Sequence, residues 1–204
     1  MRFVRSSGSG ARRLLGAGPV LAALAGPVAA KPVVLGDSIG VGIAAAARAP
    51  GLAHNSVAIR GDDALQQIRR TAPGSLALLS LGTNDAVGGA RDVAPAIDRL
   101  VAAARAGRLR LVWVGPPCVF KPWNAEAARL DAILRGRLGG EVTYVSLADR
   151  AICDRRLRAA DGVHFTAAGY ALIWRRVQAA VGIAPARPVA GSVAAGPALR
   201  PVLP

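Results

Sequence analysis

The sequence predicts an α/β domain in which a parallel sheet of five strands is covered by helices on both faces. Short apolar runs, which are typical of buried strands, alternate along the chain with longer segments whose apolar residues recur at helical spacing. Glycine, proline or polar residues separate the two kinds of segment. Such an alternation is typical of parallel sheets, because each crossover between parallel strands needs a helix.

The first half of the domain contains two predicted strands and two predicted helices. Pro32–Gly36 is an apolar run that ends in glycine, and the alanine-rich helix Ile39–Ala49 follows it and stops at a proline. Ser56–Ile59 is the second predicted strand, which ends before an Arg-Gly turn. Asp63–Thr71 is then expected to form a short helix.

The second half repeats the alternation. Its strands carry the most apolar segments, and its helices are amphipathic or, in the last case, begin at a threonine suited to capping. We expect strands at Ser75–Leu81, Leu109–Gly115 and Val142–Ser146, and helices at Asp92–Ala106, Asn124–Leu138 and Thr166–Val181.

Both ends of the chain differ in composition from the domain. Four arginines precede an apolar stretch at residues 14–26, and the small residues Val28, Ala29 and Ala30 follow it. This order predicts a signal peptide over 1–30 and therefore a periplasmic or secreted protein; an uncleaved anchor or a basic arm are the alternatives. Residues 31–182 then form the domain, and 183–204 are a Pro/Ala-rich tail that we expect to be disordered.

Composition excludes several classes of protein. Hydrophobic residues make up 52% of the chain, too many for disorder throughout, and after the signal no long apolar segment suggests an integral membrane span. The net charge is +14, but the basic residues are scattered and aromatic residues are only 4%, so nucleic acid is disfavoured as a partner. Biased composition and a functional charge both remain open, as does the oligomeric state.

Polar residues gather in the loops that follow the predicted strands. These loops contain Gly36-Asp37-Ser38, Gly61, Gly82-Thr83-Asn84-Asp85 and, before the last helix, Asp161-Gly162-Val163-His164. The carboxyl ends of parallel strands meet at one edge of the sheet, so residues far apart in sequence are expected to converge there.

The residue types in these loops suit nucleophilic catalysis. Ser38 would be the nucleophile, His164 its base, and Asp161 would orient the imidazole from three residues away. Asp149 and Asp154 are competing partners for the histidine. The oxyanion formed by such an attack needs donors, which the backbone N–H groups of Ser38 and Gly61 and the side-chain amide of Asn84 could supply.

The four motifs, in this order, resemble those of the SGNH, or GDSL-type, hydrolase family. The resemblance runs from about Pro32 to Gly182 and implies a flavodoxin-like three-layer α/β/α fold with esterase, lipase or thioesterase chemistry. It also implies Ser38, Asp161 and His164 as the triad, with Ser38, Gly61 and Asn84 as the oxyanion hole. Ile39 departs from the family, where leucine is common.

The two cysteines are expected to form a disulfide. In a flavodoxin-like strand order the loops that carry Cys118 and Cys153 are neighbours, and an exported protein would keep such a bond. Two free thiols are the alternative. The sequence shows no metal-ligand spacing and no nucleotide-binding loop, so we expect no cofactor.

We therefore expect an exported serine esterase that hydrolyses small acyl esters, for example O-acetyl groups on a polysaccharide. An O-acyltransferase with the same triad is the first alternative. A glycan-binding module without activity is the second. The sequence alone does not determine the natural substrate or the acyl chain length. It also does not distinguish the general export route from the twin-arginine route.

Overall fold

The computed structural model describes residues 32–140 and 142–184. The predicted signal peptide, residues 1–30, and nearly all of the predicted tail lie outside the described residues. The elements follow in the order β1 (Val33–Gly36), α1 (Ser38–Ala47), α2 (Asp62–Arg70), β2 (Leu76–Ser80), α3 (Thr83–Val87), α4 (Ala94–Ala106), β3 (Arg110–Pro117), α5 (Asn124–Leu138), β4 (Thr143–Leu147), the 3₁₀ turn η1 (Arg155–Leu157) and α6 (Ala167–Val181).

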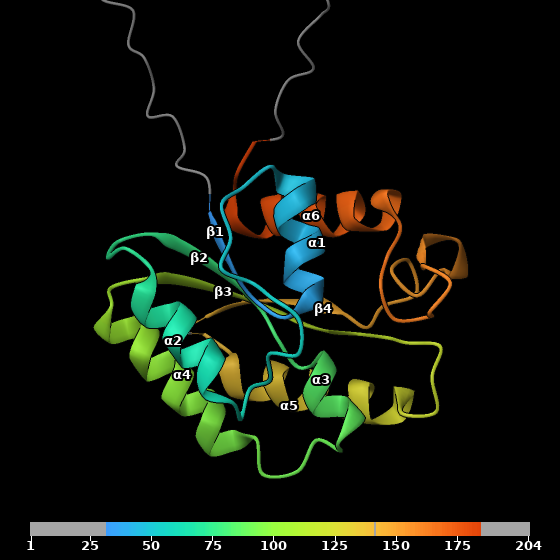
Figure 1. Cartoon of the computed structure of the whole chain (residues 1–204), viewed down its shortest axis with the longest axis horizontal. Coiled ribbons are helices and arrows are strands. Elements are labelled where there is room, and N and C mark those ends of the chain that lie inside the picture. The colour runs from blue at the N-terminus through green and yellow to red at the C-terminus, as the bar shows by residue number, and fades with distance from the viewer. Residues whose placement is uncertain (1–31, 141, 185–204) are drawn as a thin grey trace, which may run out of the picture.

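The strands of the described chain form one parallel sheet in the order β1-β2-β3-β4 (Figure 1). All of the connections run through helices, as parallel pairing requires. The α/β fold with a helix-covered parallel sheet is therefore as predicted. All of the predicted helices form, with ends shifted by a few residues at most, and α3 is a short helix where the sequence predicts a loop.

The predicted strand at Ser56–Ile59 is wrong, and the described sheet has four strands rather than five. The chain does run beside β1, but earlier, where Leu52 and Ala53 donate backbone hydrogen bonds to the carbonyl of Val34. At Ser56 the backbone turns into the left-handed region with φ of 65°, which ends any extended pairing. Only an isolated bridge between Val34 and Gly51 remains of the edge strand.

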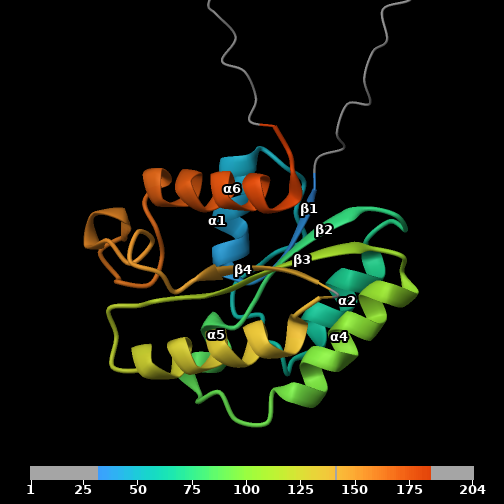
Figure 2. The ribbon, with the colours of Figure 1, turned by 180° about the vertical axis from the view of Figure 1, so that it is seen from behind.

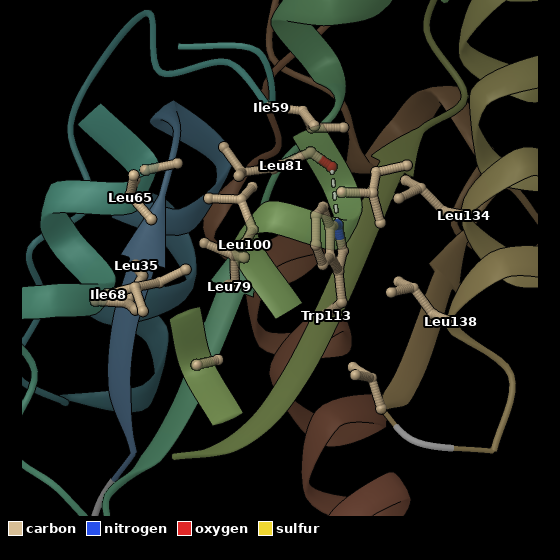
Figure 3. Packing of buried hydrophobic residues seen from close by; sticks show 14 of the residues in the cluster. Leu35, Ile59, Leu65, Ile68, Leu79, Leu81, Leu100, Trp113, Leu134 and Leu138 are labelled. Atoms are coloured by element: carbon tan, nitrogen blue, oxygen red, sulfur yellow. Dashed lines mark hydrogen bonds between the residues drawn. The ribbon is translucent and has the colours of Figure 1, made fainter. Parts of the chain in front are cut away.

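Two layers of helices cover the sheet (Figures 1 and 2). Helices α1 and α6 pack on one face, and α2, α4 and α5 lie on the other. Alternate strand residues supply the two cores: Leu35 and Leu79 face the larger cluster, whereas Val34 and Leu78 face the smaller one. In the larger cluster the buried Trp113 ring donates an Nε1 hydrogen bond to the carbonyl of Leu81 at 3.4 Å (Figure 3).

Two glycines allow the close packing around the start of α1. Gly36 ends β1 with φ of +108°, and a Cβ there would lie 1.8 Å from the Ser80 carbonyl oxygen on β2. Gly42 faces the ring of Tyr170 on α6, and a Cβ would lie 2.1 Å from that ring. The sharp exit from β1 and the contact between α1 and α6 therefore both depend on the absence of a side chain.

Candidate active site

Ser38 lies at the turn from β1 into α1. Asp37 is the N-cap residue of α1, and its Oδ1 accepts hydrogen bonds from the N–H groups of Ile39 at 3.0 Å and Gly40 at 3.4 Å. Ser38 is the first helical residue, so its own N–H has no partner within the helix. The turn thus presents both the hydroxyl and a backbone donor at the carboxyl edge of the sheet.

His164 and Asp161 reach the same edge from the loop before α6. The Nε2 of His164 lies 2.8 Å from the Oγ of Ser38, and its Nδ1 lies 2.5 Å from the Oδ2 of Asp161. In the tautomer that donates Nδ1–H to the carboxylate, Nε2 accepts the hydrogen of the serine hydroxyl. The structure therefore joins Ser38, His164 and Asp161 in one hydrogen-bonded chain, although 126 residues separate the serine from the histidine.

The Asp161 carboxylate is held in its ionised form. Partial burial acts to raise its pKa, but hydrogen bonds from the His164 ring and from the N–H groups of Val163 and His164 outweigh burial and lower the pKa to about 2. A carboxylate that stays charged can stabilise an imidazolium ring beside it. The competing aspartates are engaged elsewhere, Asp149 with Arg176 and Asp154 with Arg156.

The three side chains lie in an open site. The side chain of His164 is 39% exposed and that of Asp161 is 47% exposed. Water can therefore reach the imidazole directly. A cavity of about 440 Å³ lies at the opposite edge of the sheet, where it is lined by the first residues of β2, β3 and β4, so it is not part of this site.

The predicted oxyanion donors differ in their availability. The Nδ2 of Asn84 donates to the carbonyl of Val57 at 2.8 Å, which uses one of its two hydrogens. The N–H of Gly61 instead donates to the carbonyl of Ala58 at 3.2 Å. Ser38 N–H and the second Asn84 hydrogen are thus the donors without a described partner, and Gly61 can join them only by leaving its turn.

The backbone conformation of Gly61 does not require a glycine. Its φ of −78° is an ordinary extended value, and a Cβ would meet only the Ala58 carbonyl oxygen, at 3.5 Å. The packing of the described chain therefore does not account for a glycine at this position. A ligand that approaches this turn closely would account for it.

Two further polar residues, Gln67 and Asp85, brace the loops that carry these groups. Gln67 on α2 accepts a hydrogen bond from the N–H of Gly36 at 2.5 Å and donates one to its carbonyl at 3.2 Å. Its amide thereby gives the backbone of Gly36, at the end of β1, the hydrogen-bond donor and acceptor that an edge strand would have given. The Oδ2 of Asp85 accepts from the N–H of Ile59 at 2.8 Å, which ties α3 to the turn before Gly61.

This bracing role of Gln67 was not predicted from the sequence. Gln67 lies on the same side of α2 as Ala64 and Ile68, and all three are buried. A polar residue within the apolar stripe of an amphipathic helix was the available signal.

Asp37 is fully buried directly before the nucleophile. Burial raises its pKa to about 6, against the opposing effect of the N–H groups of Ile39 and Gly40. Its Oδ1 also accepts the Ser80 hydroxyl at 3.4 Å, while its Oδ2 has no hydrogen-bond partner among the described residues. The cap of α1 therefore contains a costly buried carboxyl group.

Cys118 and Cys153 are joined in a disulfide, with Cα atoms 5.8 Å apart. The bond links the segment after β3 to the loop after β4, close to the chain that leads to Asp161. Within residues 32–140 and 142–184, no cluster of three His, Cys, Asp or Glu side chains is suited to holding a metal ion. No helix of the same residues is long and apolar enough to cross a bilayer.

Solved structures share this fold at low sequence identity. Phospholipase A1 from Streptomyces albidoflavus NA297 is 18% identical, with a TM-score of 0.58, over 72% of this chain and 98% of that chain. The extracellular lipase from Streptomyces rimosus is 16% identical, with a TM-score of 0.59, over 72% and 98%. The OSK domain of Drosophila Oskar is 13% identical, with a TM-score of 0.57, over 74% and 87%.

The family itself is identified from the sequence. No curated protein matches the chain significantly. The GDSL-like lipase/acylhydrolase family matches residues 34–172, which is more than half of the 204 residues and includes all four motif loops. The predicted resemblance to SGNH, or GDSL-type, hydrolases is therefore confirmed, and the chain belongs to the GDSL-like lipase/acylhydrolase family.

Proposed function

We propose that the chain is a serine esterase that hydrolyses small acyl esters, with Ser38 as nucleophile, His164 as general base and Asp161 as the group that orients and stabilises the histidine. The observation that carries this proposal is the hydrogen-bonded chain from Asp161 through His164 to Ser38, with distances of 2.5 and 2.8 Å. The distance of 2.8 Å between Oγ of Ser38 and Nε2 of His164 is within the range needed for proton transfer. Family membership supports hydrolase chemistry at this site.

In the acylation step the Oγ of Ser38 attacks the carbonyl carbon of the ester while Nε2 of His164 takes the hydroxyl proton. The oxyanion that forms is stabilised by the Ser38 N–H and the free hydrogen of the Asn84 amide. The carbon–oxygen bond to the alcohol then breaks, and the imidazolium returns its proton to the departing alcohol. The acyl group remains as an ester on Ser38.

In the deacylation step His164 takes a proton from water as the water oxygen attacks the acyl carbon. The carbon–oxygen bond to Ser38 then breaks, the imidazolium returns the proton to Oγ of Ser38, and the acid leaves. The exposure of His164 and Asp161 supports water as the acceptor, because the site leaves the imidazole open to solvent. A transferase would need to exclude water from the acyl-enzyme. This open geometry favours hydrolysis over the alternative O-acyltransferase, and the intact triad geometry argues against a glycan-binding module without activity.

The disulfide supports a second part of the proposal, which is that the protein is exported. Disulfides persist in oxidising compartments and are rare in the cytosol. We expect cleavage after Ala30, so N-terminal sequencing of the mature protein should begin at Lys31. Recovery of the intact N-terminus from the cytoplasmic fraction alone would contradict export. O-acetyl groups on a polysaccharide are small acyl esters that an exported enzyme with an open site would reach.

A series of p-nitrophenyl esters with increasing acyl length tests the esterase proposal. We expect the acetyl and butyryl esters to be hydrolysed fastest, and Ser38→Ala to abolish the activity without loss of folding. Ser56→Ala is a matched control, because Ser56 is an exposed residue in a turn. A Ser38→Ala variant that kept over a tenth of the wild-type rate would rule the nucleophile out.

A further inference from the structure

Arg158 is a buried cation that the proposed reaction does not use. It is 6% exposed, although arginine is almost never buried unless it is paired. None of the ion pairs between described residues includes it. Burial lowers its pKa to about 10, so the guanidinium is still charged at neutral pH.

The guanidinium holds the residues on both sides of His164. Its Nη1 donates to the carbonyl of Val163 at 3.0 Å, and its central carbon lies 3.6 Å from the centroid of the Phe165 ring. The planar cation thus satisfies a carbonyl on one side of the histidine and stacks on an aromatic face on the other. A displacement of either neighbour would displace the imidazole between them.

The same guanidinium holds the segment after β3. Its Nη2 donates to the carbonyl of Cys118 at 2.6 Å, with a longer contact of 3.4 Å to the carbonyl of Ile152. Cys118 is itself fixed by its disulfide to Cys153. Arg158 therefore connects a covalently fixed segment to the loop that carries His164.

Backbone bonds make this loop a short hairpin with its base at Arg158. Arg158 pairs antiparallel with Phe165, and the N–H of Ala159 donates to the carbonyl of His164 at 2.9 Å. The tip carries Asp161, and the carbonyl of Gly162 accepts from the N–H of Phe120 at 2.9 Å. One hairpin thus presents both members of the pair that faces Ser38.

A buried charge without a direct ion pair is costly, although the Asp161 carboxylate acts favourably on Arg158, and an apolar residue of similar size is often at least as stable. Arginine at this position is therefore poorly explained by stability alone. Its fork of donors suits three carbonyl groups and a ring face at once, which lysine cannot match.

We propose that Arg158 is a positioning residue that holds the His164 hairpin against the disulfide-bonded Cys118 segment and so keeps Nε2 of His164 within hydrogen-bond distance of Ser38. The effect on turnover rests on the proposed esterase function. The effect on the histidine itself does not, and the two are measured separately.

The first experiment compares Arg158→Met and Arg158→Lys with Arg156→Met as the matched control. The side chain of Arg156 is 89% exposed and pairs with Asp154. On p-nitrophenyl acetate, well below each melting temperature, we expect kcat to fall about 10- to 100-fold in both Arg158 variants with KM within about twofold of wild type. The control should keep the wild-type kcat.

Arg158→Lys keeps the charge and most of the side-chain length, so it answers the question even where Arg158→Met fails to fold. A folded Arg158→Lys protein with wild-type kcat would overturn the proposal. An equal fall of kcat in the Arg156→Met control would also overturn it, because the effect would then follow any loss of positive charge near the hairpin.

The second experiment observes the histidine directly by proton NMR. The chain has two histidines, His54 and His164, and a His164→Ala variant assigns the signals. The wild type should show a low-field Nδ1 proton from the bond between His164 and Asp161. That signal should broaden or vanish in Arg158→Lys and stay in the Arg156→Met control.

An unchanged signal would overturn the positioning role. A lost signal in a protein whose wild type hydrolyses no ester would instead uphold the role of Arg158 and refute the proposed function. A double-mutant cycle with Cys118→Ala/Cys153→Ala tests the link to the disulfide. The two changes should reduce kcat less than additively, because both act through the Cys118 segment, and full additivity would show that the disulfide and Arg158 act independently.

Discussion

We propose two roles for the Asn84 amide, which fastens a loop and, in the proposed mechanism, donates to the oxyanion. One hydrogen of its Nδ2 group is donated to the carbonyl of Val57, and the other is the one that we propose for the oxyanion. The bond to Val57 fixes the direction of the amide, so the remaining N–H is oriented before substrate binds. Preorganised donors of this kind stabilise charge that develops only in the transition state.

Replacement of Asn84 by alanine should therefore lower kcat about 100- to 1000-fold with little change in KM. Steady-state kinetics on the best p-nitrophenyl ester measures both constants. Asn55→Ala is a suitable control, because Asn55 is an exposed turn residue. A loss confined to KM would show that Asn84 binds the ground state and is not an oxyanion donor.

Asp37 gives a second prediction at this scale. Its pKa is about 6 in the folded protein against an ordinary value of 3.8, so the folded state binds the proton more tightly than the unfolded chain does. The stability that this group contributes is present below pH 3.8 and is lost as the pH rises through 6. Asp37→Asn removes the titration and can retain the cap through its amide oxygen.

As the pH rises from 4 to 7, the unfolding free energy of the wild type should therefore fall relative to that of the Asp37→Asn variant. A shift of this size corresponds to a fall on the order of 2 to 3 kcal/mol. Urea unfolding at several pH values measures it. A difference between the two proteins that stayed constant over this range would show that Asp37 is already ionised in the folded protein at pH 4.

Among the elements, the loop between β4 and α6 depends most on cross-links. It contains one 3₁₀ turn, η1, and it carries Asp161, His164 and Cys153. A loop with so little regular structure needs tertiary contacts to hold the proposed catalytic pair in place. The disulfide, the guanidinium of Arg158 and the ion pair of Asp149 with Arg176 provide them.

Thiol titration under denaturing, non-reducing conditions should find no free thiol in protein recovered from the periplasm. The bond closes a loop with a sequence separation of 35 residues, which corresponds to roughly 3–4 kcal/mol of stabilisation on the chain-entropy model. Mild reduction should lower activity before the far-UV circular dichroism of the core changes. Two free thiols per chain, or full activity after complete reduction, would contradict this account.

The sequence predicts most elements because each obeys a local rule. β1 and β2 are nearly continuous apolar runs, and Thr166 caps α6 through its side chain, which accepts from the N–H of Gly169 at 3.2 Å. The Ser56–Ile59 strand fails because Val57 and Ile59 are buried in an irregular segment, and burial alone does not distinguish this from a strand. The side-chain amide of Gln67 instead hydrogen-bonds the backbone of Gly36 at the end of β1. No local sequence rule predicts that a side chain will replace the hydrogen bonds of an edge strand.

The site follows the same division. Ser38, Asp161 and His164 were predictable because the fold class places the carboxyl ends of the strands together. The hydrogen bonds from Gly61 N–H to Ala58 and from the Arg158 guanidinium to Val163 were not predictable, because both depend on the path of irregular backbone. Tertiary contacts, which have no periodicity, decide such details.

At the scale of the whole molecule, the fold brings the loop after β1 and the loop before α6 together, so that Ser38 meets His164 and Asp161. The two helix layers, α1 with α6 and α2 with α4 and α5, fix the edge at which those loops meet (Figure 1). The net charge of +14 is spread over the chain, and several arginines of the described part are paired with carboxylates, including Arg137 with Asp98 and Arg135 with Asp131. The polar edge near Ser38 is the place at which we propose that the reaction occurs.

The central claim is that Ser38 forms the covalent intermediate with His164 as its base. Labelling with a fluorophosphonate, followed by peptide mass mapping, tests it most directly. The account predicts one label per chain on the peptide that contains Ser38, none in Ser38→Ala, and labelling slowed by orders of magnitude in His164→Ala. A label on another residue, or equal labelling of the Ser38→Ala protein, would contradict it.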